Sequence, residues 1–319
     1  MLKNYIKIAR PDHWIKNAFI LPGVAIGLLL SDDAFSADTV LKLFAGFFAT
    51  CFIASANYVI NEWLDAEFDR FHPTKKNRPV VSENMKFSLV MAEYAICIII
   101  GVALSLLVNR YFLYTELWLL IMGVLYNVKP IRTKDIPYLD VLSESINNMI
   151  RLLLGWFIIT VKTIPPSSVL IGYWFAGAFL MATKRFAEYR MIGDPEKAGL
   201  YRRSFKFYSE QSLLISSFFY ALCSTFFIGI FMIKYRIEYL VGMPFIFGLF
   251  CFYLYISFKP DSAVQKPEKL YREKNLLIYL AVLITVLIIL TFVDIPFLNR
   301  WVDPWMIEVS KGVLCNALI

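Results

Sequence analysis

The sequence has few charged side chains and only two histidines. Asp, Glu, Lys and Arg account for 18% of the 319 residues, whereas about a quarter of the residues in soluble domains are charged. Hydrophobic residues account for 59%, so the composition excludes an ordinary soluble protein and indicates an integral membrane protein. His13 and His72 both lie beside basic residues, and we expect no mechanism based on a histidine acid or base.

Cysteines are also scarce, and their spacing excludes two further classes of protein. The five cysteines form no Cys-x-x-Cys pair, and all but Cys315 fall inside apolar stretches, namely Cys51, Cys97, Cys223 and Cys251. Neither a disulfide framework nor a zinc site is therefore expected. The longest polar stretches, 61–86 and 184–209, are too short for a soluble domain, so we predict a single transmembrane domain over residues 1–319.

Long apolar stretches dominate what is present. A helix needs about 20 apolar residues to cross a bilayer, and nine stretches approach or exceed that length: 14–30, 39–60, 85–108, 111–128, 138–161, 167–187, 210–233, 238–258 and 275–294. We predict an all-α bundle of nine transmembrane helices, with the two termini on opposite sides. The first stretch lacks a small-residue cleavage site, so we expect it to be a retained helix.

Basic residues predict the orientation in the membrane. Most of the 32 Lys and Arg lie in the amino-terminal segment and in alternate loops, at 61–86, 129–137, 184–209 and 259–274. By the positive-inside rule these segments are cytoplasmic, and the carboxyl terminus lies on the opposite side of the cell inner (plasma) membrane. The net charge of +7 then indicates anionic membrane lipid or an anionic substrate, and no nucleic acid.

An acidic run followed by a basic run forms the first candidate site. Asn61, Asp65 and Asp69 recur every four residues and share one face of a helix, with Glu62 beside them. Mg²⁺ commonly takes one or two protein carboxylates and completes its coordination with water and phosphate. Phosphate oxygens would then meet the basic residues that follow, which are Lys75, Lys76 and Arg78. The alternative is a solvated charged loop between two spans.

A second, mixed site continues the apolar stretch that ends near Ala182. Lys184, Arg185 and Glu188 have the spacing of intrahelical ion pairs, which would be a purely structural arrangement. Ionisable groups at the membrane surface need partners or a wet cavity, so an anionic head group is the other interpretation. Further basic or polar residues lie in neighbouring loops, namely Tyr126, Lys129, Arg132, Lys134, Arg202, Arg203 and Lys206.

Span 138–161 carries a polar stripe. Glu144, Asn147, Asn148 and Arg151 follow helical spacing, so the stripe is expected to face the interior of the bundle. Two interpretations stay open, a functional site and polar contacts that join neighbouring helices.

The segment Asn61-Glu-Trp-Leu-Asp65-Ala-Glu-Phe-Asp69, followed by Arg78-Pro79, resembles the first aspartate-rich motif of the UbiA superfamily of membrane prenyltransferases. That motif reads Asn-Asp-x-x-Asp-x-x-x-Asp, and Glu62 replaces its second residue. Within the superfamily the sequence is more similar to the polyprenyl-phosphate phosphoribosyltransferases (decaprenyl-phosphate phosphoribosyltransferase-like). The similarity covers about residues 9 to 212 and includes Arg10-Pro11, Trp14-x-Lys16-Asn17, His72-Pro73-Thr74-Lys75 and Lys184-Arg185-x-x-Glu188.

The resemblance implies a Mg²⁺-dependent membrane transferase with nine helices around a central cavity. Typical members have a second aspartate pair for another Mg²⁺, but here Lys184 and Arg185 stand in that region and only Glu188 is acidic. This departure favours a branch in which a water-soluble donor carries the diphosphate. The expected reaction transfers the 5-phosphoribosyl group from phosphoribosyl pyrophosphate to a polyprenyl phosphate.

The expected roles follow the motifs. Asp65, Asp69 and Asn61 are the predicted metal ligands, and Asp65, Asp69, Lys184 and Glu188 the predicted catalytic residues. The predicted substrate-binding residues are Lys16, Asn61, Glu62, Lys75, Arg78, Tyr126, Lys129, Lys134, Arg185 and Arg202. One alternative is transfer of an isoprenyl group from its diphosphate to an aromatic or other small acceptor. Another is a transporter or lipid-binding protein, which would place polar residues near the midplane of several spans.

Overall fold

The computed structural model describes residues 2–33, 35–71, 75–82, 85–260, 262–265 and 267–302, and all regular structure in them is helical. The all-α prediction is confirmed. The long helices are α2 (Leu21–Leu30, continuing the 3-10 helix η1, Pro11–Ile20), α3 (Ala37–Asp69), α5 (Phe87–Val108), α6 (Arg110–Asn127), α7 (Leu139–Ile159), α8 (Ser167–Ile192), α10 (Glu210–Tyr235), α11 (Met243–Ser257, following η5, Ile237–Gly242) and α12 (Lys274–Phe292).

Short helices fill the ends of the bundle. These are α1 (Leu2–Ile8), α4 (Pro79–Ser82), α9 (Pro195–Tyr201), α13 (Pro296–Val302) and the 3-10 turns η2 (Lys75–Asn77), η3 (Thr133–Asp135), η4 (Arg203–Lys206), η6 (Ala263–Gln265) and η7 (Pro267–Arg272). The nine predicted stretches all contain helix. Among the described residues, six helical segments have the length and composition to cross a membrane: 3–30, 37–69, 87–108, 210–235, 237–257 and 274–292. The count of nine crossing helices therefore stays a prediction.

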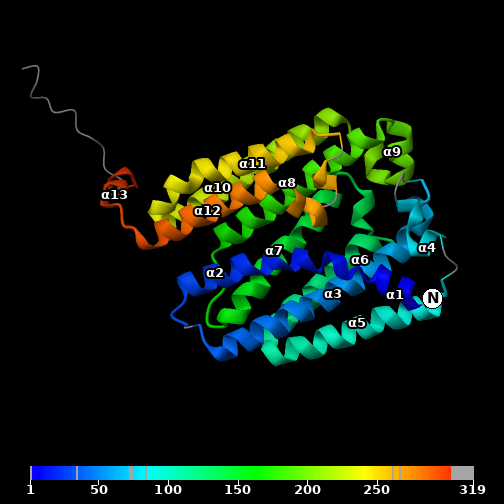
Figure 1. Ribbon diagram of the computed structural model, residues 1–319, viewed down its shortest axis with the longest axis horizontal. Coiled ribbons are helices and arrows are strands. Elements are labelled where there is room, and N and C mark those ends of the chain that lie inside the picture. The colour runs from blue at the N-terminus through cyan, green and yellow to red at the C-terminus, as the bar shows by residue number, and fades with distance from the viewer. Residues whose placement is uncertain are drawn as a thin grey trace, which may run out of the picture.

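Figure 1 shows the long helices running side by side, with α1, α4 and α9 gathered at one end of the bundle and α13 at the other. Helix α7 is central because it contacts α2, α3, α6 and α8. Helices α3, α5 and α6 pack together on one side, and α8, α10, α11 and α12 form the other side. The predicted loops 61–86, 129–137 and 184–209 meet at the end that carries α4 and α9.

Two glycines allow α2 and α7 to touch through their backbones. A Cβ atom on Gly23 would lie 2.0 Å from the carbonyl oxygen of Leu152, and one on Gly155 would lie 2.0 Å from that of Ile20. Such contacts between small residues are a common way of packing membrane helices, because they maximise van der Waals contact where lipid offers no hydrophobic drive.

Apolar side chains lie both inside the bundle and on its outer faces. Ile53, Phe112 and Leu154 belong to a buried cluster between α2, α3, α6 and α7. On the outside, Ile99 of α5 and Phe226 of α10 are 66% and 65% exposed. Exposed apolar residues along long helices are typical of a lipid-facing surface.

Helix α3 continues through the acidic motif. It begins with a capping box at Ser36 and Thr39 and ends only at Asp69, nine residues beyond the predicted span. Helix α8 likewise extends to Ile192 and carries the second motif on its last turns. The two predicted loops 61–86 and 184–209 therefore begin as rigid helix, which fixes the direction of their functional side chains.

Candidate active site

Three acidic residues near the end of α3, Glu62, Asp65 and Asp69, are each paired with a cation from another segment. Glu62 is buried and accepts a hydrogen bond from Arg10 Nη2, with a nitrogen to oxygen distance of 2.8 Å. Asp69 is also buried and pairs with Arg78, which precedes α4. Removing a carboxylate from water is costly without such a partner, so these pairs stabilise the acidic helix end.

Asp65 is held by the loop between α6 and α7. Its Oδ1 accepts from Arg132 Nη2 at 2.9 Å and from Lys134 Nζ at 2.5 Å. Lys134 Nζ also contacts Asn127 Oδ1 at 2.7 Å, and Asn61 Nδ2 donates to the same oxygen. Asn61 and Asp65 therefore belong to one hydrogen-bonded network.

The backbone at Arg132 is adapted to this contact. Arg132 has φ 33° and ψ 62°, which lies in the left-handed region that side chains other than glycine rarely adopt. Its side chain also donates to the carbonyl oxygen of Asn127 at 3.0 Å and to Asp135 at 3.1 Å. Strained backbone held in place by such contacts is often found where a side chain must be aimed at a site.

Asp65 and Asp69 line one open pocket together with Phe68, Arg132, Lys134, Asp135, Tyr201, Arg202 and Arg203. The residues present fit a Mg²⁺ ion. In the described part of the chain, Asp65 accepts hydrogen bonds only through Oδ1 and Asp69 only through Oδ2, so each keeps a second oxygen for a cation. Asn61 donates through Nδ2 and keeps its carbonyl oxygen. The described residues contain no cluster of three or more His, Cys, Asp or Glu suited to a metal, so substrate or water oxygens would complete the coordination.

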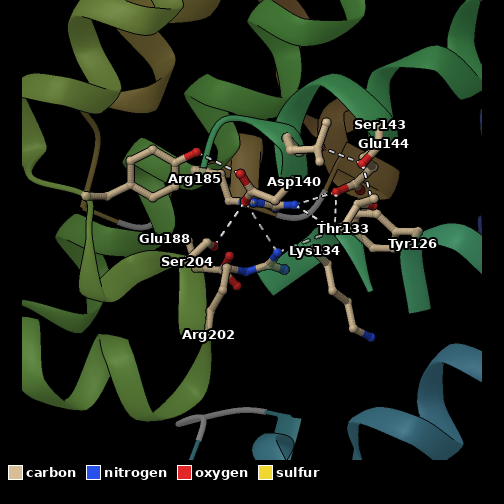
Figure 2. Close-up of polar contacts among 12 residues, drawn as sticks. Tyr126, Thr133, Lys134, Asp140, Ser143, Glu144, Arg185, Glu188, Arg202 and Ser204 are labelled. Atoms are coloured by element: carbon tan, nitrogen blue, oxygen red, sulfur yellow. Dashed lines mark hydrogen bonds and ion pairs between the residues drawn. The ribbon is translucent and has the colours of Figure 1, made fainter. Parts of the chain in front are cut away.

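A second polar cluster is centred on Arg185, which is fully buried (Figure 2). Its Nε donates to Asp140 Oδ2 at 3.2 Å, and its Nη2 donates to Tyr126 at 3.1 Å and to Glu144. Tyr126 in turn donates to Glu144 at 2.8 Å. Arg185 thus pairs with carboxylates of α7, and the intrahelical pair with Glu188 considered from the spacing is not the arrangement found.

Asp140 is the carboxylate that the cluster shares. It is fully buried and accepts from Tyr208 at 2.7 Å and from Ser204 at 3.2 Å, while Arg202 Nη1 lies 3.7 Å away. Within the described residues, Arg185 Nη1 and Arg202 Nε are buried and have no hydrogen-bond acceptor. Two guanidinium N–H groups are therefore available to an anion.

Glu188 connects α8 to two segments that follow the motifs. Glu188 Oε1 accepts from Lys75 Nζ at 2.9 Å and from the Tyr201 hydroxyl at 3.0 Å. Lys75 Nζ also lies 4.3 Å from the centre of the Tyr201 ring. These contacts bring the basic segment after α3 against α8 and α9.

Two lysines of the site have lowered pKa values. Burial lowers the pKa of Lys134 to about 8, although the nearby Asp65 carboxylate acts in the opposite direction. Burial likewise lowers the pKa of Lys75 to about 8, against the effect of Glu188. Both amines are therefore charged at neutral pH and lose that charge at mildly basic pH.

The remaining predicted residues are placed as follows. Lys184 interacts electrostatically with Glu144, Lys16 and Glu188, so it belongs to the second cluster. Lys16 Nζ lies 3.0 Å from His13 Nδ1. Lys129 is exposed, and none of the described hydrogen bonds or ion pairs joins it to either cluster. Residues 72–74, which carry part of the motif, lie outside the described residues.

Several residues of the site were not among those predicted from the sequence. They are Arg10, Asn127, Arg132, Asp140, Tyr201, Ser204 and Tyr208. Asp140 offered a signal, because a carboxylate at the start of an otherwise apolar span needs a partner. The tyrosines and Ser204 offered none, since such residues are common at membrane surfaces.

Comparison with known proteins agrees with this geometry. Residues 20–281 match the model of the UbiA prenyltransferase family. Decaprenyl-phosphate phosphoribosyltransferase of Mycolicibacterium smegmatis is 32% identical over 224 residues, covering 67% of this chain and 65% of the relative. The protein of the same name from Corynebacterium glutamicum is 28% identical over 204 residues, covering 57% of this chain and 54% of the relative. The matches thus span about half to two thirds of these relatives.

Solved structures show the same fold. A UbiA homologue from Archaeoglobus fulgidus bound to GPP and Mg²⁺ superimposes with a TM-score of 0.65 and 20% identity, over 91% of this chain and 100% of that one. The same homologue bound to DMAPP and Mg²⁺ gives a TM-score of 0.66 at 21% identity. The family match over most of the chain and this shared fold lead to one conclusion: the protein belongs to the UbiA prenyltransferase family.

Proposed function

We propose that this protein transfers the 5-phosphoribosyl group from phosphoribosyl pyrophosphate to a polyprenyl phosphate, with Mg²⁺ as cofactor. The products are polyprenylphosphoryl-5-phosphoribose, a lipid-linked sugar donor for cell-envelope glycans, and pyrophosphate. Two relatives that carry the name decaprenyl-phosphate phosphoribosyltransferase support this assignment.

The observation that carries the proposal is that Arg185 and Arg202 both lie beside the Asp140 carboxylate. Where typical family members are expected to place a second aspartate pair for metal, this chain has Lys184 and Arg185. Arg185 and Arg202 lie beside carboxylates of α7. Arg185 Nη1 and Arg202 Nε have no acceptor among the described residues. Fixed guanidinium groups of this kind suit phosphate oxygens of a highly charged donor.

The first site is assigned to the pyrophosphate end of the donor. Asp65 and Asp69, with the carbonyl oxygen of Asn61, would hold Mg²⁺, which would neutralise charge on the leaving pyrophosphate. Lys75 and Lys134 are assigned to the pyrophosphate oxygens, where negative charge grows as the bond breaks. Arg132 takes part from the lining of the same pocket, and Arg78 takes part through its pair with Asp69. Glu62 is held in place by Arg10.

The chemical step requires no general base. The bond between ribose C1 and the pyrophosphate oxygen breaks with both electrons leaving on pyrophosphate, and a lipid phosphate oxygen forms the new bond to C1. Because the phosphate is already an anion, no proton needs to be removed. Lys184, Arg185 and Tyr126 are assigned to phosphate groups, and Glu188 to orienting Lys75 or a ribose hydroxyl.

The site lies at the end of the bundle that carries α4 and α9, where a water-soluble donor and a lipid acceptor meet. We assign this end to the cytoplasm and the protein to the cell inner membrane, as the distribution of basic residues predicts. We also assign the whole chain to one transmembrane domain.

The test is a transfer assay in proteoliposomes with Mg²⁺, labelled phosphoribosyl pyrophosphate and a polyprenyl phosphate. The expected result is label in the lipid fraction with wild type and none with Asp65→Asn. A matched control is Asp38→Asn, which removes an exposed carboxylate at the other end of α3. Absence of transfer with several chain lengths, together with prenyl transfer to an aromatic acid, would establish the alternative enzyme. Label carried across the vesicle without entering lipid would indicate a transporter.

A further inference from the structure

Arg151 of α7 is a cation inside the bundle that forms no ion pair with any residue that the structure describes, although the buried Glu116 of α6 interacts with it electrostatically. Its side chain is largely buried, at 8% exposure. Nε donates to Asn17 Oδ1 at 3.0 Å, and Nη1 donates to the carbonyl oxygen of Asn147 at 3.1 Å. Among the described residues no carboxylate lies within ion-pair distance of this guanidinium, in contrast to Arg185.

An uncompensated charge at this position is costly. A guanidinium group does not lose its proton in proteins, and neutral amide oxygens offset only part of the cost of removing it from water. Nη2 makes no hydrogen bond to any residue that the structure describes, so one edge of the group remains available. Ionisable groups in membrane bundles that lack a protein partner typically mark a ligand or ion pathway.

A second polar group without a partner among the described residues lies one helical turn before Arg151. Asn147 Oδ1 is buried and has no hydrogen-bond partner in the described part of the chain. A lone carbonyl oxygen at such a position needs a donor, which a bound hydroxyl group or water supplies. Arg151 and Asn147 together therefore indicate a polar ligand inside the bundle.

The depth of Arg151 distinguishes this place from the donor site. Arg151 lies twelve positions after Leu139, the first residue of α7, so its Cα lies about 18 Å along the helix at 1.5 Å per residue. The contact with Asn147 turns the guanidinium back toward the end of the bundle that carries Asp140. The adjacent positions Ile150 and Leu154 belong to the apolar core.

The two regions are connected through Tyr58 of α3. Tyr58 interacts electrostatically with both Arg151 and Lys184, and Lys184 interacts with Glu144 and Lys16. Arg151 and Lys184 therefore both lie within electrostatic range of Tyr58.

We propose that Arg151, held by Asn17, binds the phosphate monoester of the lipid acceptor and positions it for the reaction. This inference rests on the proposed function. The carboxylates and lysines that suit a metal-bound diphosphate lie at the mouth of the site, whereas Arg151 lies deep among apolar residues. A phosphate attached to a long hydrocarbon chain can be placed at that depth because its chain stays in an apolar environment, and the Arg151 guanidinium offsets the cost of removing the phosphate charge from water.

The test compares Arg151→Gln and Arg151→Lys with Arg110→Gln, which removes an exposed arginine. Loss of one charge-assisted contact predicts a KM for polyprenyl phosphate about 10- to 100-fold higher in Arg151→Gln, with a nearly unchanged KM for phosphoribosyl pyrophosphate. Arg151→Lys keeps the charge and should recover part of the loss. Arg110→Gln should match wild type in both KM values.

A binding measurement without turnover separates the role of Arg151 in lipid binding from the proposed phosphoribosyl transfer. Polyprenyl phosphate should raise the unfolding temperature of the purified wild type and not that of Arg151→Gln. Uncharged polyprenol should raise the unfolding temperature of wild type less than polyprenyl phosphate does, because it lacks the phosphate that Arg151 binds. Ribose 5-phosphate tests a water-soluble source of the same phosphate, and a shift that it alone gives through Arg151 would overturn the lipid assignment. If wild type transfers phosphoribose while both Arg151 variants bind the lipid normally, the inference fails and the proposed function stands. If lipid binding depends on Arg151 but no phosphoribose is transferred, the assignment of Arg151 to the lipid phosphate stands and the proposed function fails.

Discussion

Lys75 and Lys134 predict a steep loss of activity at basic pH. Burial lowers the pKa of each amine to about 8. Each amine is then about nine-tenths protonated at pH 7 and about one-tenth at pH 9. If both charges hold the pyrophosphate, kcat/KM for phosphoribosyl pyrophosphate should fall about 100-fold across this range, with a limiting slope near two on a logarithmic plot.

Arginine substitutions separate the two lysines. Arg keeps its charge throughout this range, so Lys134→Arg or Lys75→Arg should reduce the fall to about tenfold and the slope to about one. The double variant should lose most of the dependence. The matched control is Lys162→Arg, because Lys162 is exposed and pairs with Asp33 away from the site. Initial rates would be measured in buffers of constant ionic strength.

Unfolding does not account for this loss. The folded-state pKa of each lysine lies below the usual 10.5, so the unfolded chain binds more protons between pH 8 and 10. The contribution of each lysine to stability therefore rises with pH over the window in which activity falls. A profile that stays flat to pH 10, or one that is unchanged in the double arginine variant, would refute the assignment of these amines to the pyrophosphate.

Three further predictions concern the metal, the buried ion pairs and the helix contact. Asp65→Asn should abolish transfer while the protein still inserts in the membrane, and EDTA should abolish transfer by wild type until Mg²⁺ is restored; activity that survives both treatments would contradict the metal assignment. Arg185→Gln should lower the free energy of unfolding by about 3–5 kcal/mol because the Asp140 and Glu144 carboxylates then lose the guanidinium that they share, and adding Asp140→Asn should recover part of it in denaturant titrations. Gly155→Ala should cost about 1–3 kcal/mol by forcing α2 from α7, whereas Gly229→Ala, whose nearest contact is 4.0 Å away, should not destabilise.

The helical class and the places of the long helices followed from the sequence, because long apolar stretches in a membrane satisfy their backbone groups only as helices. The acidic motif was also readable. Asn61, Asp65 and Asp69 recur with helical spacing, and α3 does continue through them. Their joint position on one helix was thus predictable from local chemistry.

The partners of these groups were not predictable. Arg185 pairs with Asp140 and Glu144, which are more than 40 positions earlier in the chain, and not with Glu188 one turn away. Spacing along one helix cannot reveal which helix packs against it. The same limit applies to Arg151, because its place in the polar stripe did not indicate that its guanidinium contacts Asn17 of η1.

The length of α3 has a consequence for how reactants and products separate. Its 33 residues extend about 50 Å, whereas the hydrocarbon layer of a bilayer is about 30 Å thick. Helix α3 is thus longer than the hydrocarbon layer, and we expect its acidic last turns to reach the aqueous surface of the membrane. In the reaction proposed, the released pyrophosphate diffuses away into a large aqueous volume, while the lipid product remains confined to two dimensions. Because the two products are in different phases, they would rarely bind the enzyme together, which would disfavour the reverse reaction.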